Sequence, residues 1–288
     1  MAELADLRRH IEQLERVVVA FSGGADSSLL AWVANDVLGP ARTLVVTAVS
    51  PSLSKAALAD CRLLAQEWQF NYVEVNTHED ELPGYVANGP DRCWYCKDEL
   101  MRRLVPLTES SLPGARNARV LLGVNLDDLG EHRPGQLAAR KAGAVFPLVD
   151  AGFTKADVRE VSRALGLRTW DKPAAPCLAS RLPYGTAVTA RALGMVAKAE
   201  SALMELGFSE LRVRHYGDLA RVELPLAQLG RALSQRAQVV RAVKSAGYHY
   251  VTLDLEGLRS GNLSAFLTAK SALPNDKVLA PQGLESEK

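Results

Sequence analysis

The stretch AFSGGADSSLL, residues 20–30, decides the fold assignment, because it places two glycines, an aspartate and three serines between apolar residues. The preceding RVVVAF (16–21) is rich in β-branched residues and predicts a strand, whereas ADSSLLAWVANDVL (25–38) predicts a helix. A glycine-rich turn from a strand into a helix lets an anion approach the free N–H groups of the first helical turn. An ordinary turn capped by Ser and Asp is the alternative, and composition alone leaves both interpretations open.

The same alternation of strands and helices continues along the first half of the chain. RTLVVTAV (42–49), NYVEV (71–75) and RVLLGV (119–124) predict further strands, and SKAALADCRLLAQEW (54–68) predicts a helix. Strands that are apolar throughout and separated by helices are typical of a parallel sheet covered on both faces. We therefore predict a doubly wound α/β domain over residues 1–170, with its ligands at the carboxyl ends of the strands.

A second, smaller α+β domain is predicted over residues 188–270. Residues 171–187, in a proline-rich stretch, form the expected junction loop that carries Cys177. Beyond it we expect helices over 188–206 and 226–246, a hairpin in LRVRHYGDLARVEL (211–224) and a strand over 248–255. The polar tail, 271–288, is expected to be disordered.

Charge and cysteine content exclude several classes of protein. The formal net charge is +1, so the protein has no overall positive field that would attract nucleic acid, and we expect no nucleic-acid partner. The amino terminus is not a signal peptide, and no apolar run is long enough to span a membrane, so we expect a cytoplasmic protein. In that compartment the four cysteines favour metal, cluster or redox roles over disulfides.

The glycine-rich turn also carries polar side chains suited to a nucleotide. Ser22, Ser27 and Ser28 offer hydroxyl groups, and Asp26 can hold Mg²⁺ or cap the helix. Neither GxxxxGK[ST] nor GxGxxG is present. SGGADSS instead resembles the SGGxDSS signature of the PP-loop ATP pyrophosphatases. The resemblance implies that this loop, including Gly23 and Gly24, holds the pyrophosphate of ATP with Mg²⁺ while the α-phosphate is attacked.

A second motif, GVNLDDLGEHRPG (123–135), follows a predicted buried strand. It places Asp127 and Asp128 at the carboxyl end of that strand, where adjacent carboxylates can bind Mg²⁺ or orient the nucleotide. The alternative is that they cap the helix expected to begin near Pro134. Together with the first motif, the pair favours nucleotide or metal binding.

Three of the four cysteines are candidates for chemistry. Cys61 lies on the apolar stripe of its predicted helix and is expected to be a core residue. Cys93 and Cys96 form DRCWYCK, with cations on either side, and Cys177 lies in PAAPCLASRLPYG. Three thiolates are one short of a complete zinc site or of a fully ligated cluster, and a cluster held by three thiolates has one open iron.

Taken together, SGGADSS, GVNLDDLGEHRPG, the CxxC region, PCLASRLPYG and LRVRHYGDLARVE resemble the LarE-type sulfur transferases over roughly residues 2–260. The resemblance implies that ATP adenylates a carboxylate of a pyridinium-3,5-biscarboxylic acid mononucleotide and that sulfur then replaces the adenylate. In one branch of the family the cysteine at the position of Cys177 gives up its sulfur and becomes dehydroalanine. In the other, cysteines at the positions of Cys93, Cys96 and Cys177 hold a 4Fe-4S cluster that delivers sulfide from an unknown donor.

Since all three cysteines are present, the sequence favours the cluster branch. The sacrificial route stays open, because Cys177 is present in both branches. The family also implies a homo-oligomer, a hexamer.

The predicted hairpin carries a candidate anion site. A two-residue turn at Gly217-Asp218 would place Arg212 opposite Glu223 as an ion pair and Arg214 opposite Arg221 as a like-charge pair that an anion would relieve. A solvated polar face is the alternative. The resemblance implies that the substrate phosphate binds Arg212 and Arg214.

Two further residues are weaker candidates. Glu200 is expected to contact the same substrate from the preceding helix. Arg181 is expected either to neutralise phosphate or adenylate charge near Cys177 or to hold the junction loop.

Other functions remain open on the same residues. A PP-loop tRNA thiolase would use the same chemistry, but the sequence has no basic tract or RNA-binding module. A nitrogen-inserting ligase of the superfamily leaves the three cysteines without a role. The protein could also be a nucleotide sensor that binds its ligand without turnover. For the cysteines, the alternative is a CxxC that holds a structural zinc ion.

Overall fold

The structure is a computed structural model that describes residues 3–110, 115–130, 133–173 and 176–259. Its first unit contains four strands, β1 (Val17–Ala20), β2 (Thr43–Val49), β3 (Tyr72–Asn76) and β4 (Arg119–Leu122). The helices of this unit are α1 (Leu4–Glu12), α2 (Ala25–Leu38), α3 (Lys55–Glu67), α4 (Pro83–Val86), α5 (Arg92–Leu104), α6 (Pro134–Lys141), α7 (Pro147–Asp150) and α8 (Lys155–Ala164).

The four strands form one parallel sheet in the order β3-β2-β1-β4. Val17 of β1 lies level with Thr43 of β2 on one side and with Arg119 of β4 on the other. The chain therefore proceeds from β1 to β2 and β3 in one direction and returns to place β4 on the opposite side of β1. This reversal makes the space beyond the carboxyl ends of β1 and β4 the topological switch point of the sheet.

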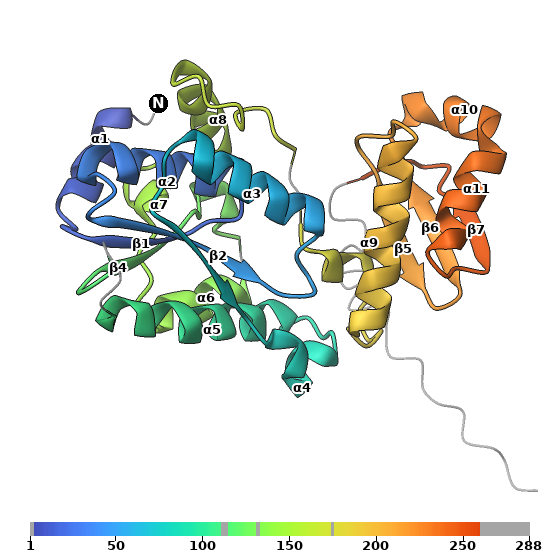
Figure 1. Ribbon diagram of the computed structural model, residues 1–288, viewed down its shortest axis with the longest axis horizontal. Helices are drawn as coiled ribbons and strands as arrows, with labels where there is room; N and C mark the ends of the chain where they lie inside the picture. The colour runs from blue at the N-terminus through green and yellow to red at the C-terminus, as the bar shows by residue number, and fades with distance from the viewer. Residues whose placement is uncertain (1–2, 111–114, 131–132, 174–175, 260–288) are drawn as a thin grey trace, which may run out of the picture.

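Helices cover both faces of the sheet, which confirms the doubly wound α/β fold. Alternate residues of β1 belong to different cores: Val17 and Val19 pack with α1, α2, α3 and α8, whereas Val18 packs with α5 and α6. Figure 1 shows these two helical layers above and below the sheet. The two central strands, β1 and β2, are mostly buried and apolar along most of their length, as the sequence predicts, whereas the edge strand β3 exposes Glu74 and Asn76.

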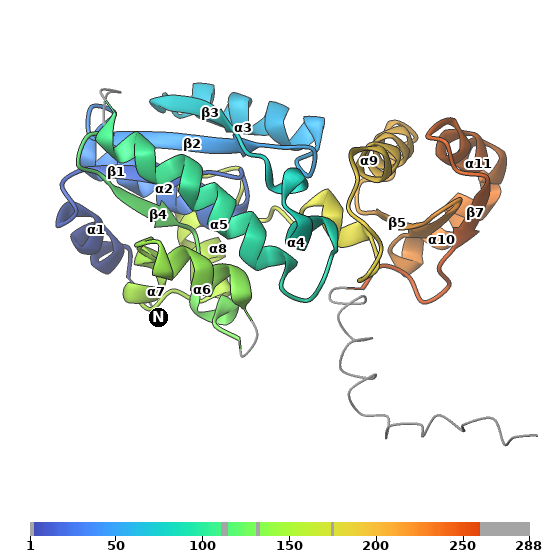
Figure 2. The ribbon, with the colours of Figure 1, turned by 90° about the horizontal axis from the view of Figure 1, so that it is seen from below.

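A second sheet, in the order β5-β6-β7, forms the smaller unit. Its strands are β5 (Arg212–Tyr216), β6 (Leu219–Glu223) and β7 (Tyr250–Leu253), and its helices are α9 (Ala190–Glu205), α10 (Leu226–Ser234) and α11 (Arg236–Ser245). The single helix predicted over 226–246 is wrong, because the backbone leaves the helical region at Gln235 (φ −99°, ψ 20°). Figure 2 shows α9 on the side of this unit that faces the first.

An apolar cluster joins the two units. Tyr85 of α4 packs with residues of a short 3₁₀ helix, η4 (Leu178–Arg181), and of α9. Asn88 strengthens the junction, since its side-chain amide donates to the carbonyls of Pro183 (2.8 Å) and Thr186 (2.9 Å). The junction loop is therefore fixed to both units.

The predicted domain limits remain predictions, and the predicted tail, 271–288, lies outside the described residues. In the part of the chain that is described, no helix is both long and apolar enough to cross a membrane.

Candidate functional site

The glycine-rich loop lies where the sequence predicts it, between β1 and α2. Gly23 has a φ of +67°, a conformation that glycine adopts readily, and Gly24 is the residue that precedes α2, in an extended conformation. No side chain caps α2 at Gly24. The N–H groups of the first turn of α2 are therefore available to an anion at the switch point.

The second motif begins directly beside this loop. A Cβ atom placed on Gly123 would lie 2.7 Å from the backbone nitrogen of Ser27 and 2.9 Å from the carbonyl carbon of Asp26. Only glycine allows β4 to end this close to the first turn of α2. Gly123 is the first residue of the second motif, but only the tertiary structure shows why a glycine is needed there.

Hydroxyl groups within the loop bind one another. The Ser22 and Ser27 oxygens are 3.1 Å apart, and the Ser27 hydroxyl also donates to the carbonyl of Gly24 (3.1 Å). Ser28 is completely buried. Ser22 and Ser27 thus shape the loop, whereas the buried hydroxyl of Ser28 has no hydrogen-bond partner among the described residues, and the role of the three hydroxyl groups in phosphate binding remains a prediction.

Asp26 is held by two residues that the sequence analysis did not identify. Its carboxylate accepts a hydrogen bond from the Asn125 amide (2.9 Å) and forms an ion pair with the ammonium of Lys155. Asn125 is buried and lies two residues before Asp127. The sequence offered a signal for Asn125, because it stands inside the second motif, but none for Lys155 at the start of α8.

The adjacent carboxylates of the second motif occupy capping positions. Asp127 accepts a hydrogen bond from the backbone N–H of Lys155 (2.6 Å), at the first residue of α8. Asp128 forms a capping box with Asn125 around a short 3₁₀ helix. The capping alternative is therefore observed, although with different partners than expected, and the role of the pair in Mg²⁺ binding remains a prediction.

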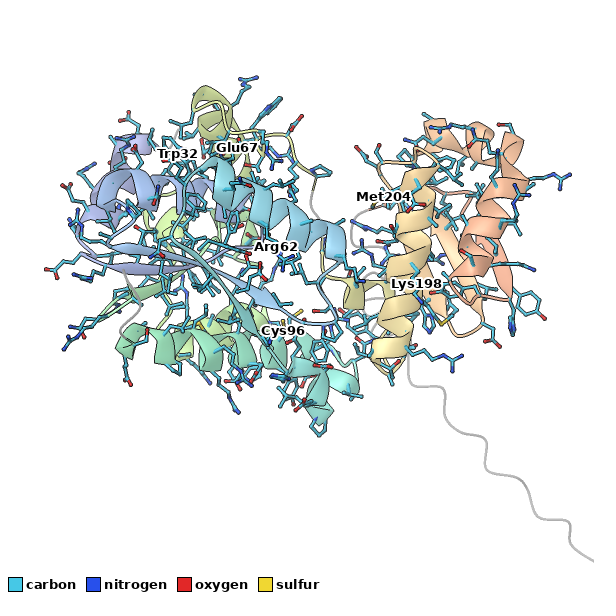
Figure 3. All side chains as sticks on the ribbon, viewed as in Figure 1. Trp32, Arg62, Glu67, Cys96, Lys198 and Met204 are labelled. Carbon is cyan, nitrogen blue, oxygen red and sulfur yellow. The ribbon has the colours of Figure 1, made fainter. Side chains whose placement is uncertain are left out.

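The three candidate cysteines gather at the junction of the two units. Cys93 and Cys96 lie in the first two turns of α5, and Cys177 immediately precedes η4. Figure 3 labels Cys96 on the side of the first unit below the sheet. Buried Arg92 connects the two segments, because its guanidinium donates to Asn88 (2.6 Å) and to the carbonyl of Ala179 in η4 (2.9 Å).

The charges of the three cysteines influence the same neighbouring groups. Burial raises the pKa of Cys96 to about 12; Lys97 opposes this shift, and the charges of Cys177 and Cys93 add to it. Burial alone would lower the pKa of Arg92, but the charges of Cys177 and Cys93 raise it overall. Buried Arg92 thus keeps its positive charge between the two cysteine-bearing segments.

The arrangement does not form a ready metal site. Among the residues that the structure describes, no three His, Cys, Asp or Glu side chains are placed to hold a metal ion. Cys93 and Cys177 are exposed, whereas Cys96 is partly buried. The residues therefore do not fit a preformed 4Fe-4S cluster, and we derive no chemical step through one.

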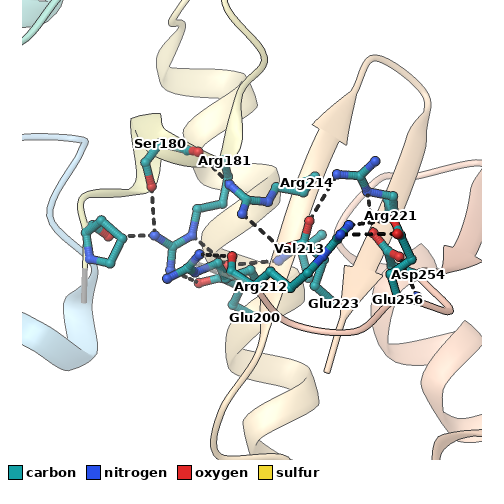
Figure 4. A network of polar contacts seen from close by, with 12 residues as sticks. Ser180, Arg181, Glu200, Arg212, Val213, Arg214, Arg221, Glu223, Asp254 and Glu256 are labelled. Atoms are coloured by element: carbon teal, nitrogen blue, oxygen red, sulfur yellow. Dashed lines mark hydrogen bonds and ion pairs between the residues drawn. The ribbon is translucent and has the colours of Figure 1, made fainter. Parts of the chain in front are cut away.

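A network of arginines and glutamates connects Cys177 with the smaller sheet (Figure 4). Buried Arg181 makes a two-point ion pair with Glu200 and donates to the carbonyls of Pro176 (2.6 Å) and Cys177 (3.3 Å). Arg214 donates to the carbonyl of Ser180 (2.8 Å). Arg181 thus holds the junction loop, as one of its two predicted roles requires.

The hairpin has the predicted register, with Arg212 opposite Glu223 and Arg214 opposite Arg221. Glu223 is fully buried and pairs with both Arg214 (2.9 Å) and Arg221 (3.0 Å). The protein therefore offsets the like-charge pair with its own carboxylate, and the binding of a substrate phosphate at Arg214 remains a prediction.

Arg212, at the start of β5, is only partly buried, and its role as a phosphate ligand remains a prediction. Its guanidinium donates to the carbonyl of Arg259 (3.1 Å). Burial lowers the pKa of Arg212, and the neighbouring charges of Arg214 and Arg181 lower it further. An anion beside Arg212 would favour its charged form.

The fold and the loop at the switch point define a nucleotide-binding α/β protein of the PP-loop class. Consistent with this, the family model for NAD synthase matches residues 5–82. The chain is also 38% identical to the pyridinium-3,5-bisthiocarboxylic acid mononucleotide synthase of Lactiplantibacillus plantarum, over 92% of this chain and 94% of that protein. It belongs to the family of that synthase, the LarE-type PP-loop proteins.

Two further relatives extend over similar lengths. An uncharacterized protein of Synechocystis is 43% identical over 93% of this chain and 98% of its own length. An uncharacterized protein of Methanocaldococcus jannaschii is 26% identical over 85% of this chain and 92% of its own length.

Proposed function

We propose that this protein is an ATP-dependent sulfur transferase. Its substrate is a pyridinium-3,5-biscarboxylic acid mononucleotide, of which it adenylates a carboxylate and then converts that carboxylate to a thiocarboxylate. The match to the bisthiocarboxylic acid mononucleotide synthase supports the substrate class, because the chain covers nearly all of that relative.

One structural observation carries the proposal. A single network joins the thiol segment to a cluster of guanidinium groups, since Arg181 holds the carbonyl of Cys177 and Arg214 holds the neighbouring carbonyl of Ser180. A substrate phosphate bound beside Arg212 would therefore lie on the same framework as the sulfur of Cys177. Guanidinium groups suit phosphate because they donate two parallel hydrogen bonds.

The first step forms the activated acyl group. A carboxylate oxygen of the substrate attacks the α-phosphorus of ATP, the bond to the bridging oxygen breaks, and pyrophosphate leaves. Amides at the start of α2 and the residues around Asp26 position this diphosphate and any Mg²⁺ that accompanies it. The product is a mixed anhydride of the carboxylic acid and AMP.

The second step replaces AMP with sulfur. In the route that this chain supplies by itself, the Cys177 thiolate attacks the acyl carbon, AMP leaves, and a thioester forms. Removal of the Cα proton of Cys177 then breaks its Cβ–S bond, which releases the thiocarboxylate and leaves dehydroalanine. The cluster route predicted from the three cysteines would instead use added sulfide and preserve Cys177.

Pyrophosphate release tests the proposal. With ATP and the biscarboxylic acid mononucleotide, wild-type protein should release pyrophosphate and form thiocarboxylate. Cys177→Ala should still release pyrophosphate but form no thiocarboxylate, because the thiol acts only after adenylation. Ser201→Ala, which removes a side-chain atom of similar size at an exposed position of α9, is the control and should keep both activities.

Two outcomes would contradict the proposal. ATP binding without any acceptor-dependent pyrophosphate release would indicate a nucleotide sensor. Full thiocarboxylate formation by Cys177→Ala would show that Cys177 in the junction loop takes no part in sulfur transfer.

A further inference from the structure

The segment that leads from α8 towards Cys177 touches the phosphate loop through one side chain. The ammonium of Lys172 donates to the carbonyl of Gly23 at 2.7 Å and forms an ion pair with Asp60 of α3. Lys172 is separated from Gly23 by 149 positions in the sequence. The SGGADSS motif contains no lysine, but Lys172 from a distant segment supplies one to the loop.

This contact fixes the orientation of one peptide group. In a trans peptide the C=O and the N–H point in opposite directions within one plane. When Lys172 holds the carbonyl of Gly23, the N–H of Gly24 must point to the opposite side of the loop. Gly24 immediately precedes α2, so this N–H joins the anion-binding groups of the helix start.

The space around Gly23 agrees with this direction. A Cβ atom on Gly23 would lie 3.0 Å from the Cys61 sulfur and 3.6 Å from the Lys172 nitrogen. That side of the loop is thus occupied by the protein, and a diphosphate has to bind on the other side, which the N–H of Gly24 faces.

The neighbours of Lys172 hold its ammonium in place. Partial burial would raise the pKa of Asp60, but hydrogen bonds from Lys172 and Arg168 lower it, so its carboxylate stays charged. The backbone of Lys172 is held as well, because its carbonyl accepts from Arg159 of α8 (3.2 Å). A flexible lysine fixed at both ends can orient a loop without a large entropic cost on ligand binding.

From this geometry we infer that Lys172 is a positioning residue of the ATP site, which holds the Gly23–Gly24 peptide so that its N–H faces the departing pyrophosphate. The inference rests on the proposed use of ATP and extends it to a residue outside the motif. Lys172 acts through the loop.

Calorimetry on the full-length protein with inorganic pyrophosphate and with AMP tests the inference. Lys172→Met should bind pyrophosphate about ten- to a hundredfold more weakly, the range expected for a charged hydrogen bond that orients the site, and AMP within about twofold of wild type. Asp60→Asn should show a smaller loss in the same direction. Lys172→Arg keeps a cationic donor and should recover part of the affinity.

Lys244→Met, at an exposed position of α11, is the control and should bind both ligands like wild type. Unchanged pyrophosphate affinity in Lys172→Met would overturn the inference, and so would equal losses of pyrophosphate and AMP, which indicate a general structural role. Failure of the wild-type protein to bind pyrophosphate or ATP would overturn the proposed function itself.

Discussion

Arg181 and Glu200 form a buried two-point ion pair, with Nε to Oε1 at 2.9 Å and Nη2 to Oε2 at 3.2 Å. The same Glu200 accepts a hydrogen bond from the backbone N–H of Val213 at 3.0 Å. One carboxylate on α9 thus joins the loop that carries Cys177 to the first strand of the smaller sheet.

Glu200→Ala should therefore destabilise the protein strongly. The change leaves the Arg181 guanidinium buried without its carboxylate, and breaking one side of such a pair costs about 3–5 kcal/mol. Chemical denaturation measures the loss. Glu205→Ala, at an exposed position on the same helix, should change the free energy of unfolding by less than about 0.5 kcal/mol. Equal effects of the two substitutions would contradict the structural role of the pair.

Gly123→Ala should weaken ATP binding. The added methyl group would lie 2.7 Å from the backbone nitrogen of Ser27, so the first turn of α2 has to move. We expect the Kd for ATP to rise at least about tenfold and the protein to lose about 1–3 kcal/mol of stability, as overpacked sites do. Both quantities follow from calorimetry and denaturation.

Gly194→Ala provides the matched control. A Cβ atom at Gly194, in α9, meets no other atom within 4 Å. Alanine is a better helix former than glycine, so this change should stabilise the protein by about 0.5–1 kcal/mol and leave ATP binding unchanged. An equal loss of ATP affinity in the two variants would show that the contact between Gly123 and Ser27 does not matter.

Arg212→Ala should weaken binding of the phosphorylated substrate while ATP binding stays nearly intact. Arg212 is a cleaner probe than Arg214, because Arg214 also pairs with the buried Glu223. We expect about a tenfold or greater loss, from the removal of a charge-assisted contact. Arg241→Ala, exposed on α11, is the control. Equal losses for substrate and ATP would argue against a substrate phosphate at Arg212.

Anaerobic purification with iron and sulfide analysis distinguishes the two sulfur routes. The three cysteines in the sequence predict iron in the wild-type protein and its loss in both Cys93→Ala and Cys177→Ala, whereas the structure brings no three metal-ligating side chains of the described residues together and favours a protein without iron. Cys61→Ala should keep its iron, because Cys61 is buried on another helix. Absence of iron from the wild type, together with a loss of mass at Cys177 after turnover, would instead show that Cys177 gives up its own sulfur.

Cys96 should be the slowest of the three candidate thiols to react in the iron-free protein. Its pKa is raised to about 12, so the neutral thiol predominates below that pH, and the reaction with iodoacetamide should accelerate as the pH rises towards it. At pH 8 we expect alkylation of Cys96 to be at least tens of times slower than alkylation of the exposed Cys93. A thiolate with a high pKa is more nucleophilic, but this offsets only part of the effect of its very low population. Peptide mass spectrometry compares the sites, and equal rates would contradict the burial of Cys96.

The folded-state pKa of Cys96 also predicts a direction for stability. It lies above the ordinary value of 9.0, so the folded protein holds its proton more tightly than the unfolded chain between these values. Stability contributed by the neutral thiol is complete below pH 9 and decreases as the pH rises towards about 12. Cys96→Ala should not show this decrease in stability between pH 9 and 12. Denaturation of both proteins at several alkaline pH values measures the difference.

The sequence by itself determined the parallel sheet, the loop at its first crossover and the register of the hairpin. Each of these depends on local patterns: β-branched runs specify strands, Gly23 permits a positive φ, and Gly217-Asp218 fixes how Arg214 faces Arg221. Such patterns act over a few residues and are therefore visible in the chain.

Only the tertiary structure decided which partners complete the site. Lys155 and Lys172 reach Asp26 and Gly23 across 129 and 149 positions, and Glu223 pairs with Arg214 and Arg221 at once. These contacts depend on how helices pack on the sheet and on where long side chains end. No periodicity or motif records that information, because the free energy of such contacts arises only after the distant segments have come together.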